Sequence, residues 1–249
     1  MAAAMLMVSN RYRLATVLVP KCASTTLISL FARLHDLPPG VRGREALDAI
    51  FSSKQEIDRQ SPLIALPDKR ILEARQAFGD YTWFAVVRDP YGRLLSNYNN
   101  KINRFCANFR KGLYLRYKLV QLLRGPACWR DVRRAMPYLH SHVTYEEFVE
   151  TLRRHGVGWD RHFRPQSDIL HLDEIAYARL LRLESLERDL NDLLRAAGVP
   201  AAKLAEIRKA GRLNASRSKA PAATPEEAAA RAAVRELYKD DFKRLGYAS

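Results

Sequence analysis

Apolar and polar positions along the chain alternate between short strand-like runs and longer helical patterns. Continuous apolar runs of strand length occupy residues 15–19 and 81–87, and a third run, "RLLRL", begins at Arg179. Apolar residues at helical spacing follow the first run: Leu27, Ile28, Leu30, Phe31 and Leu34. Strands that alternate with helices favour an α/β fold with a mainly parallel sheet flanked by helices.

Capping residues mark where several of these helices begin and end. Asp89 and Pro90 suit the N-cap and the first position of a helix that follows the second strand. Residues 144–147, Thr-Tyr-Glu-Glu, have the pattern of a capping box, and Gly156 is placed to close that helix. The helix after the third strand is expected to end at Gly198.

The remaining segments complete a single predicted domain over residues 1–249. Residues 40–80 are polar and loosely helical, and residues 101–143 are expected to form a basic helical insertion. A last helix is expected over 224–246, because Thr224 suits its N-cap and Gly246 its end. An apolar stripe on that helix is expected to dock it onto the sheet: Tyr238, Phe242, Leu245 and Tyr247.

The charge of the chain adds a class of ligand to this picture. The 249 residues include 42 Lys and Arg against 27 Asp and Glu, a formal net charge of +15. Such a field attracts polyanions, which include nucleic acids, anionic lipid surfaces, acidic glycans and nucleotide phosphates.

Three scattered cysteines form neither a disulfide framework nor a metal-binding pair, which indicates a reducing compartment. No run of 18 apolar residues occurs, so no membrane span is expected.

The stretch after the first strand, "PKCASTT" at residues 20–26, has the composition of a phosphate-binding loop without glycine. A Walker loop needs glycines before its lysine, so that backbone N–H groups can wrap a polyphosphate. Here Lys21 comes first, and hydroxyl residues open a helix whose N–H groups attract an anion. A loop this short suits one phosphate group. An ordinary strand-to-helix turn with a threonine N-cap and a solvated lysine is the alternative.

A second candidate anion site follows the strand at 81–87. Arg88 lies at the end of that strand, where open α/β sheets bind ligands, and with Ser96 it offers donors to a second monoanion. Spacings of four, three and four residues place four polar residues on one helix face: Asp89, Arg93, Ser96 and Asn100. An Asp89–Arg93 ion pair on an exposed face is the alternative.

Five motifs occur in an order that resembles the carbohydrate sulfotransferases of the chondroitin/dermatan-type group, often called sulfotransferase family 2. They are "PKCAST", "RDPYGRLLSNY", "HFRPQ", "RLNAS" and "YKDDFKRLGY", and they cover the chain from about residue 15 to 247. The resemblance implies a P-loop-like α/β fold and the donor 3′-phosphoadenosine 5′-phosphosulfate (PAPS). PAPS carries a 5′-phosphosulfate and a distant 3′-phosphate, which suits two separate monoanion sites.

The resemblance also implies in-line transfer of a sulfuryl group from PAPS to a carbohydrate hydroxyl, with release of 3′,5′-ADP. Lys21 is expected near the bridging oxygen, where it neutralises charge on the leaving nucleotide. The residues expected to hold the 5′-phosphate are Cys22, Ala23, Ser24, Thr25 and Thr26. Arg88 and Ser96 are expected at the 3′-phosphate. In the family the stretch "RLNAS" lies by the nucleotide, which suggests further contacts from Arg212, Asn214 and Ser216; a flexible linker is the alternative.

A general base must take the proton of the acceptor hydroxyl. His162 matches the histidine of the family's H-x-x-P-Q motif, and imidazole, with an ordinary pKa of about 6.5, suits this role. The alternatives are a histidine that only orders its loop and a glutamate base at Glu146 or Glu147, although the capping box occupies Glu147. Phe163 stands where tryptophan is frequent in the family.

Two features remain outside this assignment. His140 and His142 form an H-x-H pair, but no third ligand has suitable spacing, so no metal is expected. The basic, aromatic segment 101–137 is either a surface for an anionic glycan or a solvated insertion.

Golgi members of the group carry a membrane anchor and stem, and this sequence shows neither. We therefore expect a cytoplasmic protein that meets membranes only peripherally, unless an anchor was removed.

Three other functions fit parts of the sequence. A nucleic-acid or polyanion-binding protein fits the net charge, but no helix-turn-helix, RNP or zinc pattern occurs, so no nucleic-acid partner is expected. A small-molecule kinase needs a Gly-Lys followed by a Mg²⁺-holding hydroxyl, which "PKCASTT" does not supply. A relative that binds nucleotide without catalysis is the third. The oligomeric state and the identity of the acceptor are not encoded in these motifs.

Overall fold

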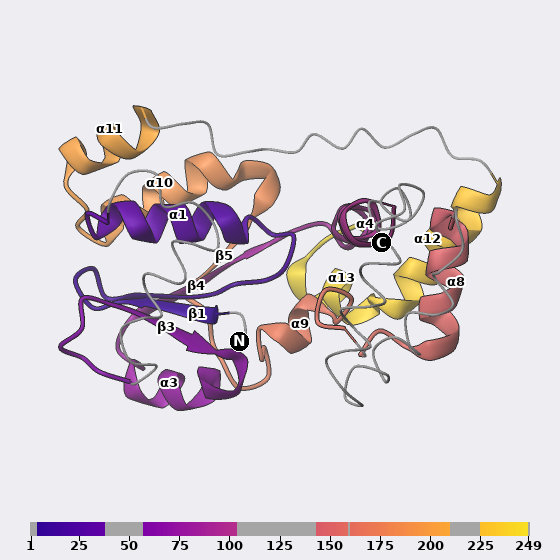
Figure 1. The fold of residues 1–249 in the computed structure, drawn as a ribbon, viewed down its shortest axis with the longest axis horizontal. Coiled ribbons are helices and arrows are strands. Elements are labelled where there is room, and N and C mark those ends of the chain that lie inside the picture. Colours follow the sequence, from indigo (N-terminus) through magenta and orange to yellow (C-terminus); the bar gives the residue numbers. More distant parts are fainter. Residues whose placement is uncertain (1–3, 38–56, 104–142, 159, 210–224, 249) are drawn as a thin grey trace, which may run out of the picture. The chain divides into compact units, whose positions relative to one another are not determined.

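The computed structural model describes residues 4–37, 57–103, 143–158, 160–209 and 225–248 (Figure 1). The chain divides into two compact units, each made of two stretches of sequence. The first, here called the sheet unit, comprises Met1–Arg88 and Gln166–Arg217. The second, here called the helical unit, comprises Asp89–Pro165 and Ser218–Ser249. The prediction of one domain over residues 1–249 stays a prediction.

The sheet unit is built on five strands in the order β3-β1-β2-β4-β5. Their bounds are β1 (Ala4–Ser9), β2 (Leu14–Val17), β3 (Leu63–Pro67), β4 (Thr82–Val87) and β5 (Arg179–Arg182). Strand β4 pairs in parallel with both β2 and β5, whereas β1 is antiparallel to β2 and β3. The α/β class is therefore confirmed. The sheet is mixed where a mainly parallel sheet was expected, because β1 and β2 form a hairpin.

Two of these strands were not predicted. The sequence of β3, "LIALP", lies within the segment expected to be loosely helical, and that expectation is wrong for residues 63–67. A run of five apolar residues fits a buried strand and a buried helix turn equally well. Strand β1 lacks polar alternation because both of its faces are covered, with Leu6, Met7 and Val8 fully buried.

Helices cover both faces of the sheet. They are α1 (Ser24–Leu34), α3 (Ile71–Ala77), α9 (Gln166–Ile169), α10 (Leu186–Ala196) and α11 (Ala201–Lys209), with short 3₁₀ turns at Asp68–Arg70 and Leu183–Ser185. Figure 1 shows α1, α10 and α11 on one side of the sheet and α3 on the other. The apolar residues predicted for α1 are buried, and Phe31 stacks on Phe84 of β4 with ring centroids 6.4 Å apart.

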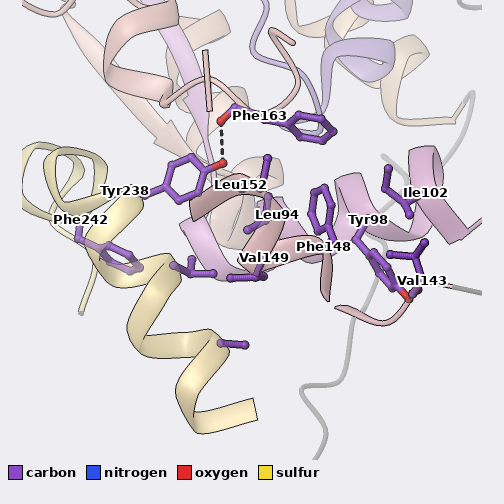
Figure 2. Packing of buried hydrophobic residues seen from close by; sticks show 12 residues of the cluster. Leu94, Tyr98, Ile102, Val143, Phe148, Val149, Leu152, Phe163, Tyr238 and Phe242 are labelled. Atoms are coloured by element: carbon purple, nitrogen blue, oxygen red, sulfur yellow. Dashed lines mark hydrogen bonds between the residues drawn. The ribbon is translucent and has the colours of Figure 1, made fainter. Parts of the chain in front are cut away.

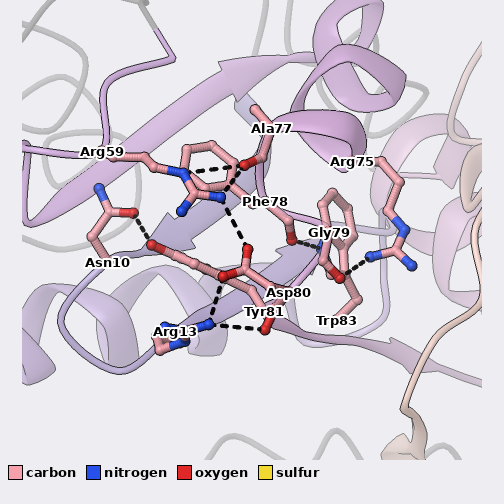
Figure 3. Close-up of polar contacts among 10 residues, drawn as sticks. All are labelled: Asn10, Arg13, Arg59, Arg75, Ala77, Phe78, Gly79, Asp80, Tyr81 and Trp83. Carbon is pink, nitrogen blue, oxygen red and sulfur yellow. Dashed lines mark hydrogen bonds and ion pairs between the residues drawn. The ribbon is translucent and has the colours of Figure 1, made fainter.

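A polar cluster holds the turn between α3 and β4 (Figure 3). Asp80 pairs with Arg13 at 2.5 Å and with Arg59 at 3.0 Å, and both guanidinium groups lie over the Tyr81 ring. The Trp83 indole N–H donates to the Phe78 carbonyl at 2.8 Å. These contacts fix where β4 begins, and so support the strand whose other end delivers Arg88.

The helical unit contains α4 (Pro90–Asn97), a π-helical turn at Tyr98–Asn103, α8 (Tyr145–His155), α12 (Pro225–Leu237) and α13 (Lys239–Leu245). Two predicted caps are confirmed. The Asp89 carboxylate accepts the Gly92 amide at 2.8 Å, and Thr144 with Glu147 forms the complete capping box of α8. Residues 104–142 of the predicted basic insertion and Thr224 lie outside the described residues.

The core of the helical unit corrects the prediction for the last helix. Tyr238 interrupts the expected helix and separates α12 from α13, and Gly246 ends α13 with a φ of 65°. Tyr238 and Phe242 pack in a cluster with residues of α4 and α8, as Figure 2 shows. Tyr238 and Phe242 of the apolar stripe therefore belong to the core of the helical unit, and the docking of the stripe onto the sheet stays a prediction.

Acidification is expected to destabilise the sheet unit through His35. Its Nε2 lies 2.9 Å from Ser9 Oγ, which also accepts the Tyr12 amide. Burial, with Arg11 nearby, lowers the pKa of His35 to about 4, although Asp36 opposes the shift. Between an ordinary value of about 6.5 and that pKa, the unfolded chain binds more protons, so the free energy of unfolding decreases as the pH is lowered.

The expected loss through His35 is about 1–2 kcal/mol between pH 7 and 5, after allowance for solvent screening. Urea denaturation at the two pH values measures it. His35→Gln should reduce the pH dependence, whereas His155→Gln, an exposed control, should not. An unchanged pH dependence in His35→Gln would contradict the assignment.

Candidate functional site

The loop between β2 and α1 reaches left-handed backbone conformations without glycine. Lys21 has a φ of 67°, and Ala23, the N-cap of α1, has φ 58° and ψ 23°. For residues that carry a Cβ atom this region costs about 1–2 kcal/mol each. Backbone strain of this kind concentrates at ligand-binding sites, where the surrounding structure holds it in place. The loop thus combines a strained backbone with the N-terminus of α1, and its binding of a phosphate group stays a prediction.

Internal hydrogen bonds close this loop around one carbonyl group. The Val19 carbonyl accepts the Cys22 amide at 3.2 Å and the Ser24 hydroxyl at 2.6 Å. The Ser24 proton is therefore directed into the loop in this structure. Thr25 is exposed in the first turn of α1 and Thr26 is half-buried. The first-turn N–H groups and these threonines are the donors that α1 can offer to an anion.

Replacing Ala23 by glycine is expected to stabilise the protein. Glycine adopts the left-handed region without the steric cost that alanine meets there, so we expect the free energy of unfolding to rise by about 0.5–1 kcal/mol. Ala205→Gly, in the exposed part of α11, should lower it by about 1 kcal/mol. Urea denaturation compares the two, and changes of the same sign would contradict the backbone argument.

Arg88 directly follows β4 and is almost fully buried, with 6% of its surface exposed. Its amide donates to Gln166 Oε1 at 3.0 Å, and its carbonyl accepts Gln166 Nε2 at 2.8 Å. Cys22 is fully buried, and its Sγ lies 3.2 Å from the same Gln166 Oε1. Only the backbone of Cys22 is thus placed to contact a ligand. Since β2 and β4 are parallel neighbours, the loop at residues 20–26 and Arg88 emerge at the same edge of the sheet.

The predicted polar face of α4 is only partly observed. The α-helix ends at Asn97, and Asn100 lies exposed in the π-helical turn, so the four residues do not share one α-helical face. Arg93 is buried, with 2% exposed, and its Nη1 donates to the Arg164 carbonyl at 2.8 Å. Because Arg93 is buried, the alternative that placed an Asp89–Arg93 pair on an exposed face is wrong about the exposure of Arg93. Ser96 is half-buried on α4.

His162 is held by a neighbouring carboxylate in the helical unit. Its Nδ1 lies 2.7 Å from Asp160 Oδ1, and its amide donates to the same oxygen at 2.8 Å. Burial by itself raises the pKa of Asp160, but the hydrogen bonds from His162 outweigh that effect, so the pKa is lowered overall. An ionised Asp160 that accepts the Nδ1–H leaves Nε2 with its lone pair, which is the tautomer that a general base requires.

Side chains also anchor the backbone on which His162 sits. The carbonyls of residues 162–164 are held in turn: Asn97 Nδ2 donates to His162 at 2.5 Å, the Tyr238 hydroxyl to Phe163 at 2.6 Å, and Arg93 to Arg164. Figure 2 shows the bond from Tyr238. Burial raises the pKa of Tyr238, which keeps that donor protonated. Three donors thus restrict the position of the imidazole.

Of the other candidates for the general base and the nucleotide site, Glu146 and Glu147 lie within the described residues. Glu147 is engaged in the capping box, where its Oε2 accepts the Thr144 amide at 2.8 Å, as predicted. Glu146 is half-buried in the first turn of α8. The remaining candidates lie outside the described residues: His140, His142, Arg212, Asn214 and Ser216.

The described part of the chain contains neither a metal-binding cluster nor a membrane-spanning helix. Within it, no three His, Cys, Asp or Glu side chains are grouped so that they could hold a metal ion. None of the helices described there has the length and apolar character needed to cross a membrane.

Sequence reasoning missed the residues that position the candidates. Gln166 was quoted only as part of the histidine motif, and Asp160 was not singled out. The Asp-Arg-His spacing at 160–162 was the one available signal for the carboxylate, because a carboxylate two residues before a histidine can cap its amide and ring together. Asn97 and Tyr238 carried no such signal, since their partners are distant in sequence.

Comparison with known proteins adds an independent line of evidence. A family model described as the sulfotransferase family matches residues 4–248. Carbohydrate sulfotransferase 11 of Rattus norvegicus is 28% identical over 200 residues, which cover 78% of this chain and 53% of that protein. Carbohydrate sulfotransferase 14 of Homo sapiens is 28% identical over 193 residues, covering 76% of this chain and 45% of that protein.

These curated relatives are longer proteins, and the chain spans about half of their length. No solved structure was found to match the chain.

Proposed function

The chain belongs to the sulfotransferase family, and on this premise we propose that it transfers a sulfuryl group from PAPS to a hydroxyl of a carbohydrate acceptor. The names of the relatives, carbohydrate sulfotransferases 11 and 14, support the class of acceptor. One structural observation carries the proposal: the strained loop after β2 and the buried Arg88 after β4 emerge at one edge of two adjacent parallel strands. Ligands of open α/β sheets bind at that edge.

The charge pattern of the donor matches this arrangement. The loop at residues 21–26, with its ammonium and helix-opening amides, suits the 5′-phosphosulfate, and Arg88 suits the 3′-phosphate. Ser96 and the stretch with Arg212, Asn214 and Ser216 complete the proposed nucleotide contacts. A net charge of +15 favours an anionic donor and is compatible with an anionic glycan or glycolipid as acceptor.

The proposed reaction is a direct displacement at sulfur. The acceptor oxygen forms a bond to sulfur as the bond from sulfur to the 5′-phosphate oxygen breaks, and that electron pair leaves with 3′,5′-ADP. The acceptor proton passes to Nε2 of His162, which Asp160 orients. Lys21 neutralises the charge that develops on the leaving oxygen. We also propose a cytoplasmic location, based on the few cysteines, with at most peripheral contact with anionic membranes.

Calorimetric titration with 3′,5′-ADP tests the donor site. Wild-type protein should bind it without added metal, and Arg88→Ala should weaken binding by about 10- to 100-fold, the value of one charged hydrogen-bonding group. Affinity for 5′-AMP, which lacks the 3′-phosphate, should change little. Arg195→Ala, an exposed arginine of α10, is the matched control.

Failure to bind 3′,5′-ADP would point to another functional class. A folded wild-type protein that fails to bind 3′,5′-ADP would refute the sulfotransferase proposal. Affinity for duplex DNA that falls steeply with salt and is insensitive to PAPS would then favour the polyanion-binding alternative, which the net charge supports.

A further inference from the structure

Gln166 is the buried residue around which the proposed donor site is organised. It is the first residue of α9, and its side chain is fully buried. Its Oε1 accepts the Arg88 amide and lies 3.2 Å from Cys22 Sγ, while its Nε2 donates to the Arg88 carbonyl. An amide oxygen has two lone pairs, so it can accept from both the amide and the thiol. One side chain thus joins two segments that are remote in sequence.

The contacts determine how the amide is oriented. Arg88 presents both an N–H and a C=O to Gln166, and only one orientation of the side-chain amide satisfies the two groups. In this orientation Gln166 imitates a neighbouring peptide group. The ladder between β4 and β5 ends with the pair Val87 and Arg182, so Gln166 continues the hydrogen bonding of β4 by one residue. The N–H and the C=O of Arg88 therefore both have hydrogen-bond partners although β4 ends at Val87.

The thiol contact ties the donor loop to the same amide. Cys22 lies between the two left-handed residues of the loop, Lys21 and Ala23. A contact at the centre of a strained turn restricts the loop as a whole, because displacement of Cys22 would alter the backbone on both sides. Gln166 consequently sets the spacing between the residues proposed for the 5′-phosphosulfate and the residue proposed for the 3′-phosphate.

We propose that Gln166 is a positioning residue that sets the preference of this protein for nucleotides with a 3′-phosphate. The proposal rests on the function proposed above. Two anionic groups on one nucleotide bind cooperatively only when both subsites are held at the matching separation, since the second contact is then intramolecular. Loss of the bridge should chiefly affect ligands that use both subsites and spare ligands that use one.

The test compares the affinities of 3′,5′-ADP and 5′-AMP by calorimetry for wild type, Gln166→Leu and Gln166→Glu. Gln166→Leu removes all three contacts. Gln166→Glu keeps the volume of the side chain and an acceptor for the Arg88 amide, but at neutral pH it loses the donor to the Arg88 carbonyl. Gln76→Leu, which replaces an exposed glutamine of α3 in the same unit, is the control.

We expect wild type and Gln76→Leu to bind 3′,5′-ADP more tightly than 5′-AMP. In both Gln166 variants the ratio of the two affinities should fall by at least about tenfold, because 3′,5′-ADP binds more weakly. An effect of this size is typical of misplaced binding groups. A purely structural residue would lower the thermal stability and leave the ratio of the two affinities unchanged. That result in a folded variant would overturn the proposal, as would failure of both variants to fold. If wild type binds neither nucleotide, the proposed function itself fails, which is a distinguishable outcome.

Discussion

Lys21→Ala is expected to reduce sulfuryl transfer by about 100- to 1,000-fold while leaving the fold intact, since removal of one group that stabilises transition-state charge has effects of this size. Lys21 precedes α1 in the strained loop and is half-buried. Its ammonium is proposed to neutralise the leaving phosphate oxygen. Release of 3′,5′-ADP in the presence of PAPS and a panel of glycan acceptors measures the rate.

Two further variants separate the charge of Lys21 from its backbone conformation. Lys21→Gly also lacks the ammonium but relaxes the left-handed backbone, so it should be as inactive as Lys21→Ala. Lys69→Ala removes an exposed lysine of the same unit and should retain full activity. Near-normal turnover in a folded Lys21→Ala protein would refute the role of the lysine, and so would recovery of activity in Lys21→Gly, which also lacks the ammonium.

His162→Ala is expected to lower kcat by about 100- to 10,000-fold, the usual contribution of a positioned general base. Affinity for 3′,5′-ADP should stay unchanged, because the base is proposed to act on the acceptor alone. His155→Ala, an exposed histidine of the same unit, is the control.

Asp160→Asn tests whether the carboxylate positions the imidazole. The hydrogen bonds from His162 lower the pKa of Asp160 despite its burial, so the carboxyl is charged throughout the neutral range. The asparagine lacks that charge and can present its NH₂ group to Nδ1, which favours the wrong tautomer. We expect a loss of kcat smaller than that of His162→Ala, with unchanged nucleotide affinity. Full activity in both variants would point to another base, with Glu146 the first to test.

Several features of the fold were predictable because their causes are local. The caps at Asp89 and Thr144, the strand at 82–87 and the buried face of α1 each follow from residues within one or two turns. The hairpin of β1 and β2 was missed because the turn at residues 10–13 has none of the Asn-Gly or Asp-Gly signals of a tight hairpin. The break at Tyr238 was missed because both flanking segments continue the same helical pattern.

In the candidate site, too, some residues were predictable from local sequence and others were not. Lys21 and Arg88 were proposed because each lies shortly after a buried strand, and His162 because of its motif. The geometry that makes them useful comes from long-range contacts: Gln166 is 144 residues from Cys22 and 78 from Arg88, and Asn97 is 65 from His162. No pattern of neighbouring residues encodes such a partner.

The sequence by itself determined where α4 and α8 begin and the family to which the chain belongs, and it suggested which residues bind anions. Only the tertiary structure decided that the loop at residues 20–26 is strained at Lys21 and Ala23, that Arg93 is buried and binds a carbonyl, that Gln166 contacts Arg88 and that Asp160 contacts His162. The physical reason is one of range. Backbone sterics and amphipathic periodicity act over a few residues, whereas a buried polar group takes whichever partner the packing of distant segments brings within hydrogen-bonding distance.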